Sequence, residues 1–187
     1  MGCILRTFVL LVVGGLAADE VAIDFNNFQS VVTESKQPWI IEFYSELCGS
    51  CKAFAPTWDG FREKVRACLL LLFSVREILE VLRSLLRPPV PLLPLQLENI
   101  QDLRVGRVCV DKPPGSKLAG GLGLLDAGIP QIAYFANHWG GNPKEFSTLE
   151  GTTVPELVDS LSAVFLREQA ELERAEHLDK LARSGEL

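Results

Sequence analysis

The chain has 187 residues, of which 48% are hydrophobic and 22% are charged. This size and composition fit one globular domain with a sizeable core, and they exclude a disordered or collagen-like chain. The formal charge of -6 gives no basic field that would attract nucleic acid, so we expect no nucleic-acid partner.

Residues 1–17 have the pattern of an export signal. Arg6 supplies a positive charge, residues 7–16 form a short apolar run, and small residues at Gly15 and Ala17 suit a cleavage site. We expect cleavage after Ala17 and a mature protein in the endoplasmic reticulum lumen or outside the cell. The alternative is a buried first strand or helix of a cytosolic protein.

The rest of the sequence predicts a layered α/β domain, residues 18–166. The run Trp39 to Tyr44 is β-prone and almost without alternation, as in a strand buried on both faces, and Glu42 is its one charged residue. Pro56 is expected to kink the helix that follows. The expected elements are helices at 25–34, 51–65, 117–125 and 155–166, and strands at 39–44, 104–110, 132–135 and 144–149.

Two segments lie outside this plan. Residues 67–103 form an atypical insertion, with a Leu-rich apolar stretch that looks like an extended helix ending in a Pro-rich turn. Charged residues interrupt it, so we expect no membrane span in the mature chain. A possible partner site is the apolar helix at 69–86; the alternatives are packing on the domain's own surface or a gene-model artefact. Residues 167–187 are expected to form a charged, solvated helical tail.

Cys48 and Cys51 are separated by two residues and lie between a buried strand and the start of a helix. Free backbone N–H groups and the helix dipole at that position stabilise a thiolate, which is the nucleophile in thiol–disulfide exchange. Cys51 lies one turn further on, within reach of Cys48, and can resolve a mixed disulfide formed there. A zinc site would need two further ligands at suitable spacing, which the sequence does not offer.

The segment from Pro38 to Lys52, Pro-Trp-Ile-Ile-Glu-Phe-Tyr-Ser-Glu-Leu-Cys-Gly-Ser-Cys-Lys, resembles a thioredoxin domain of the protein disulfide isomerase family. Further matches follow in the family's order at 108–111, at 128–132 and at Gly151. The resemblance covers about residues 20–66 and 104–166. It implies the thioredoxin fold, a central mixed sheet flanked by helices.

The resemblance also implies roles for individual residues. Glu42 takes the place of the buried acid that accepts the proton of Cys51. Pro130, after Ile129, aligns with the family's cis-proline beside the cysteine pair. Together with Gly49 and Ser50 in the redox-active Cys-Gly-Ser-Cys motif, Ile129 and Pro130 are expected to contact substrate. The implied activity is thiol–disulfide oxidation, reduction or isomerisation of protein substrates, without a cofactor.

Several features depart from the family. Ser50 stands where the isomerases usually have His, and Leu47 replaces the Trp common before the first cysteine. A pair between Cys68 and Cys109 is one option, although a buried free thiol at Cys109 is favoured. Two alternative functions remain open: a general thioredoxin-like reductase outside the secretory route, and a non-catalytic, chaperone-like client-binding module.

Overall fold

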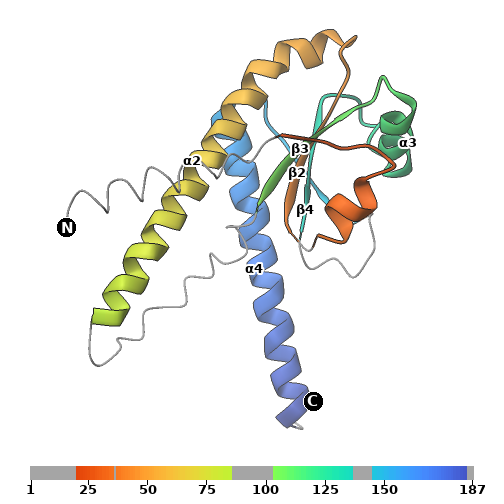
Figure 1. The fold of residues 1–187 in the computed structure, drawn as a ribbon. Helices are drawn as coiled ribbons and strands as arrows, with labels where there is room; N and C mark the ends of the chain where they lie inside the picture. Colours follow the sequence, from red (N-terminus) through yellow and green to blue (C-terminus); the bar gives the residue numbers. More distant parts are fainter. Residues whose placement is uncertain (1–19, 36, 86–102, 137–144, 185–187) are drawn as a thin grey trace, which may run out of the picture.

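The computed structural model describes residues 20–35, 37–85, 103–136 and 145–184, with the backbone alone for 72–85. Within them is a five-stranded mixed sheet of order β1-β3-β2-β4-β5 (Figure 1). β1 and β2 pair parallel to β3, and β4 pairs antiparallel to β2 and β5. The strands are β1 (Val21–Ala22), β2 (Trp39–Tyr44), β3 (Arg104–Cys109), β4 (Gln131–Phe135) and β5 (Ser147–Leu149).

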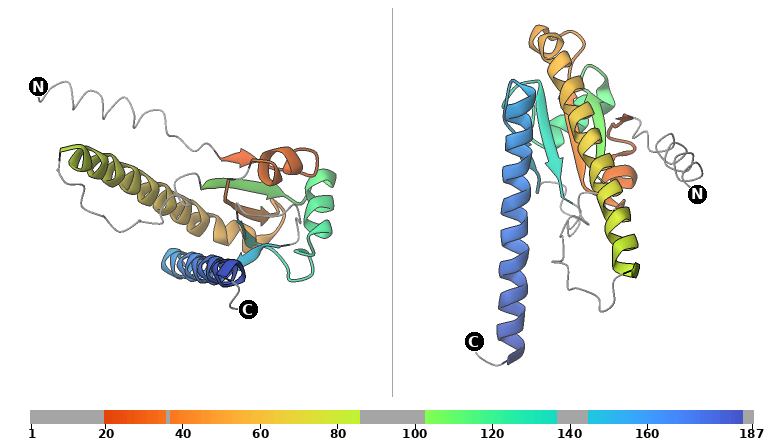
Figure 2. Two further views of the ribbon diagram at one scale, coloured as in Figure 1. Left: turned by 90° about the horizontal axis from the view of Figure 1, so that it is seen from below. Right: turned by 90° about the vertical axis from the view of Figure 1, so that its left-hand side faces the viewer.

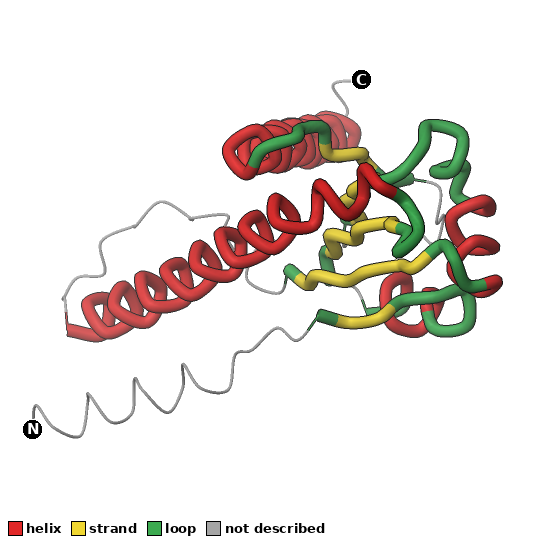
Figure 3. The backbone as a smooth tube through the Cα atoms, turned by 90° about the horizontal axis from the view of Figure 1, so that it is seen from above, coloured by secondary structure: helices red, strands yellow, loops and turns green. Residues whose placement is uncertain are grey.

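Helices cover both faces of this sheet, as Figure 3 shows. On one face lie the π-helical turn η1 (Gln29–Thr33) and α3 (Pro113–Gly121), and on the other lie α2 (Gly49–Leu85) and α4 (Val154–Ser184). Each face has its own apolar core, one centred on residues such as Phe43 and Val108, the other on Trp58 and Leu157. The predicted thioredoxin fold is therefore confirmed.

β2 runs through the centre of the sheet and is buried along its first five residues, as the lack of alternation in this β-prone run predicts. Because successive side chains alternate, Ile41 and Phe43 face η1 and α3, whereas Ile40 packs with the core beneath α2 and α4. Glu42 has the same parity as Ile40. Its carboxylate is thus directed to the α2 side of the sheet, where the cysteine pair lies.

The short helices differ from expectation. The predicted helix at 25–34 is only a five-residue π-turn, preceded by a turn in which Asp24 Oδ1 accepts the N–H of Asn26 at 2.7 Å. The helix predicted at 117–125 begins earlier, at Pro113. Two consecutive prolines start that helix because its first N–H groups need no partner within it.

The helix predicted at 51–65 is longer than expected. α2 continues without a break to Leu85, so the apolar insertion begins as an extension of this helix rather than as a separate element. Pro56 lies inside it, and the N-terminal part of α2 is set at an angle to the rest in Figure 1, as expected for an interior proline. The predicted partner site at 69–86 stays a prediction; Leu71 is 66% exposed.

α4 joins the predicted last helix and the charged tail into one helix of 31 residues. The first half of α4 packs on the domain through three buried residues, Leu157, Leu161 and Val164. Its second half is largely exposed. Both α2 and α4 extend past the sheet in the same general direction (Figure 2). None of the described helices combines the length and the apolar character required to cross a membrane. The signal predicted at 1–17 lies outside the described residues.

Candidate functional site

The turn between β2 and α2 is held in place by Asp111, which follows β3. The Ser45 hydroxyl donates to Asp111 Oδ1 at 2.6 Å, and the Glu46 N–H donates to Oδ2 at 2.6 Å. The Ser45 oxygen accepts the Leu47 N–H at 3.0 Å. The bond from Ser45 is the main reason why the pKa of Asp111 lies below its usual value. The chain is therefore fixed immediately before Cys48, a role for Asp111 that no local sequence pattern predicts.

Cys48 is half-buried just ahead of the first turn of α2. Its sulfur accepts the N–H of Cys51 at 3.4 Å and lies 2.9 Å from the Ser50 hydroxyl. These contacts, that of Ser50 above all, lower the pKa of Cys48 from 9.0 to about 7. A substantial fraction of Cys48 is therefore thiolate near neutral pH, as a nucleophilic cysteine requires.

The Ser50 hydroxyl lies between two acceptors, the sulfur of Cys48 and the carbonyl oxygen of Ile129 at 3.2 Å. A hydroxyl has one hydrogen to donate. It donates to Cys48 when that sulfur is ionised, and it is free to donate to Ile129 when the sulfur carries its own proton. Ser50 thus links the charge on Cys48 to the loop that carries Ile129.

Cys51 differs from Cys48 in both accessibility and pKa. It is 4% exposed, and burial raises the pKa of its thiol, with a further rise from the charges of Cys48 and Glu42. Two thiols one helical turn apart therefore differ in environment, one accessible and easily ionised, the other buried and protonated. Such a separation of pKa values is typical of groups with different roles in one reaction.

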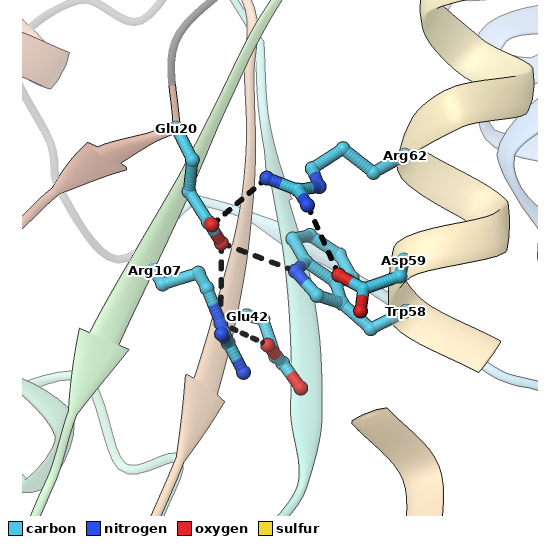
Figure 4. Close-up of polar contacts among 6 residues, drawn as sticks. All are labelled: Glu20, Glu42, Trp58, Asp59, Arg62 and Arg107. Carbon is cyan, nitrogen blue, oxygen red and sulfur yellow. Dashed lines mark hydrogen bonds and ion pairs between the residues drawn. The ribbon is translucent and has the colours of Figure 1, made fainter. Parts of the chain in front are cut away.

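Glu42 is fully buried, its charge acts on Cys51, and it lies beside Arg107 in Figure 4. Its Oε2 accepts the Nε–H of Arg107 at 2.6 Å, whereas its Oε1 is buried and has no hydrogen-bond partner among the described residues. Desolvation outweighs the favourable charge of Arg107 and raises the pKa of Glu42 from 4.5 to about 7. A carboxyl group with this pKa can both take up and release a proton near neutral pH.

Ile129 and Pro130 come to the cysteine pair from the loop before β4. The peptide bond between them is cis, and the Ile129 carbonyl lies 3.9 Å from Cys48 Sγ. Gly49 is exposed, with open space where a Cβ atom would stand, and Leu47 is 84% exposed. The structure thus brings Ile129 and Pro130 from a distant loop to the side of Cys48, next to Gly49 and Ser50.

The other described cysteines stand apart from this arrangement. Cys68 is exposed on α2, and Cys109 is a free thiol at the end of β3. Cys109 is half-buried rather than buried, because the strand ends there and its sulfur faces Asp111 Oδ2 at 3.7 Å. Within the described part of the chain, no cluster of three His, Cys, Asp or Glu residues could hold a metal ion.

Comparisons with known proteins find similarity to thioredoxin-domain proteins. Residues 20–80 match the family model for thioredoxin. Protein disulfide-isomerase like 2-2 of Arabidopsis thaliana is 50% identical over 38 residues, 20% of this chain and 8% of that protein. Sulfhydryl oxidase 1 of Homo sapiens is 44% identical over 39 residues, 21% of this chain and 5% of that protein. The first thioredoxin domain of mouse Protein disulfide-isomerase A4 has a TM-score of 0.44 and 22% identity, covering 76% of this chain and 73% of that one.

The chain therefore contains a thioredoxin domain, related to those of protein disulfide isomerases and sulfhydryl oxidases. This confirms the resemblance that the motif around Cys48 predicts. The matched segments span less than a tenth of the length of these two relatives.

Proposed function

We propose that this protein is a thiol–disulfide oxidoreductase that acts on protein disulfides in the secretory pathway. The observation that carries the proposal is the contrast between the two thiols of the Cys-Gly-Ser-Cys motif. The pKa of Cys48 is lowered to about 7 at an accessible position, while that of the buried Cys51 is raised. A static structural disulfide has no need of this contrast, whereas an exchange reaction depends on it.

The reaction begins with the Cys48 thiolate, which attacks one sulfur of a substrate disulfide. A mixed disulfide forms, and the second substrate sulfur leaves as a thiolate and takes a proton from water. Cys51 then attacks Cys48 Sγ, which breaks the mixed disulfide and releases the first substrate sulfur as a thiol. The substrate gains two electrons and two protons, and the protein gains a Cys48–Cys51 disulfide. The reverse sequence oxidises a substrate dithiol.

Glu42 serves the second step. Cys51 must lose its proton before it attacks, and its burial keeps that proton in place. A buried carboxylate whose pKa is about 7 is matched to accept it and to return it later. Its Oε1, which has no hydrogen-bond partner in the part of the chain that the structure describes, is the atom available for this transfer.

The substrate side of the site consists of Gly49, Ser50, Ile129 and Pro130. Gly49 leaves open space beside Cys48, so a protein chain can approach the sulfur. The Ile129 carbonyl offers an acceptor for a backbone N–H of an extended segment, once Ser50 donates to the Cys48 thiolate instead. The exposed Leu47 gives this rim an apolar edge.

Reduction of insulin disulfides by dithiothreitol, followed by turbidity, tests the activity. We expect the wild-type protein to accelerate the reaction and Cys48→Ser to reduce the rate to background. Cys68→Ser is the matched control, because Cys68 is also accessible but lies outside the site. Equal rates for Cys48→Ser and the wild type would refute the proposal, as would a wild-type protein without turnover, which is the behaviour of a binding module.

The secretory location rests on the sequence pattern of residues 1–17. N-terminal sequencing of the protein purified from its native source tests it. A mature chain that starts at Ala18 supports entry into the secretory pathway, and a chain that retains residues 1–17 favours a reductase outside it.

A further inference from the structure

Glu42 and Arg107 belong to a larger charged cluster on the α2 side of the sheet (Figure 4). Arg107 Nε contacts two carboxylates, Glu42 Oε2 at 2.6 Å and Glu20 Oε1 at 3.2 Å. Glu20 precedes β1, and its carboxylate also accepts the indole N–H of Trp58 at 3.3 Å and a guanidinium N–H of Arg62 at 2.8 Å. Nothing in the Cys48 motif predicts that Glu20 joins this cluster.

The geometry sets the two carboxylates in competition. The Nε–H of Arg107 donates to Glu42 Oε2, and Glu20 Oε1 forms an ion pair with the same nitrogen, so two carboxylates share one guanidinium charge. Glu20 cannot easily turn away, because Trp58 and Arg62 hold it from α2. It is 24% exposed and Glu42 is fully buried, so the charge of Glu20 acts on Glu42 with little screening from solvent.

We propose that Glu20 is a positioning residue that divides the positive charge of Arg107 between two carboxylates and thereby limits how strongly Arg107 favours the ionised form of Glu42. The inference rests on the proposed function only for its catalytic consequence. Without the charge of Glu20, Arg107 would form an ion pair with Glu42 alone and would favour the ionised carboxylate of Glu42. Glu42 would then be a weaker base for the proton of Cys51.

Among the other charged and titratable groups described around Glu42, none competes with it for Arg107 as Glu20 does. Arg107 comes from β3 and also lies over the ring of Tyr44, 3.9 Å from its centroid. From α2 come Cys51 and Asp59, and Asp59 is paired with Arg62 at 3.0 Å rather than with Arg107. Of the acids whose charges raise the pKa of Glu42, Glu20 ranks ahead of Asp59.

The test is a titration of the Glu42 side-chain carboxyl by ¹³C NMR in the wild type, Glu20→Gln and Glu63→Gln. Gln keeps the size of Glu20 and removes its charge, and its single carbonyl oxygen can still accept one of the two bonds that Trp58 and Arg62 donate to separate oxygens of Glu20. We expect the midpoint of Glu42 to fall by roughly half a pH unit or more in Glu20→Gln. Glu63 is exposed on α2 and outside the cluster, so Glu63→Gln should leave the midpoint in place. An unchanged or higher midpoint in Glu20→Gln overturns the inference.

Trp58→Phe separates charge from packing, because it removes the indole bond to Glu20 and leaves every charge of the cluster. We expect a smaller change of the Glu42 midpoint than in Glu20→Gln. A change as large as that of Glu20→Gln would mean that packing controls Glu42, and the inference would be wrong.

The readout does not require an active enzyme. An unchanged Glu42 midpoint in Glu20→Gln refutes the inference even if the protein reduces insulin. A lowered midpoint in a protein without insulin reduction supports the role of Glu20 and refutes the proposed function. If Glu20→Gln lowers the Glu42 midpoint and the protein also reduces insulin, both proposals are supported. The pH midpoint for resolution of a mixed disulfide at Cys48 should then move down in Glu20→Gln together with the Glu42 titration.

Discussion

Replacing Ser50 with Ala tests how this chain activates its nucleophile. The Ser50 hydroxyl, 2.9 Å from Cys48 Sγ, contributes most to the lowering of the Cys48 pKa from 9.0 to about 7. In Ser50→Ala the N–H of Cys51 still donates to the sulfur at 3.4 Å, so part of the lowering should survive.

The expected size of the effect follows from the thiolate fraction. With a pKa of about 7, roughly half of Cys48 is ionised at pH 7. If the hydroxyl supplies half of the lowering, the pKa of the variant becomes about 8 and the ionised fraction falls to roughly one in eleven. The rate of alkylation at pH 7 should therefore fall about fivefold.

The assay is alkylation of reduced protein by iodoacetamide between pH 5 and 10, with the site of modification assigned by mass spectrometry. Ser50→Thr is the matched control because it retains a hydroxyl at the same position, and we expect its profile to stay close to that of the wild type. A Ser50→Ala profile that superimposes on the wild type would refute the reasoning, since Ser50 would then not stabilise the thiolate.

Two further predictions concern stability. Burial raises the pKa of Glu42 from 4.5 to about 7, so the folded protein binds this proton more tightly than the unfolded chain. Its contribution is present below pH 4.5 and is lost, by about 3 kcal/mol, as the pH rises through 7. When the free energy of unfolding in urea is measured against pH, Glu42→Gln should lack this loss. Parallel pH dependences of the variant and the wild type would contradict the prediction. A Cβ at Gly115 would collide with the Cys109 carbonyl oxygen, so Gly115→Ala should lower the free energy of unfolding by about 1–3 kcal/mol. Gly121→Ala, with open space at its Cβ, should cost nothing; equal effects of the two would be contrary to this packing.

Much of the fold could be predicted because its main signals are local. The strand at Trp39–Tyr44 is six consecutive β-prone residues, and its burial follows from the lack of alternation. β1 could not be predicted, because two residues are too few to show a periodicity. Val21 joins the sheet through its pairing with Gly106 of β3, which is distant in sequence. The continuity of α2 was missed because the change in composition after residue 66 suggested a separate element; the expected kink at Pro56 lies inside the helix, which bends there.

The candidate site, too, could be predicted from the sequence only in part. Cys48 and Cys51 are adjacent in sequence, so their spacing and their place at the start of a helix could be recognised. The contacts that tune them join residues far apart in the chain: Ser50 to Ile129, Ser45 to Asp111 and Arg107 to Glu20. No local pattern encodes such pairs, and the resemblance indicated positions such as Glu42, Ile129 and Pro130 without these contacts.

The most direct test of the central claim, that Cys48 attacks substrate disulfides and Cys51 resolves the product, is to trap the intermediate. Cys51→Ser is incubated with oxidised insulin, and the products are separated without reductant and mapped by mass spectrometry. We predict a stable mixed disulfide at Cys48 that dithiothreitol releases, and none in Cys48→Ser. An adduct on Cys68 or Cys109 alone, or equal adducts in both variants, would contradict the account.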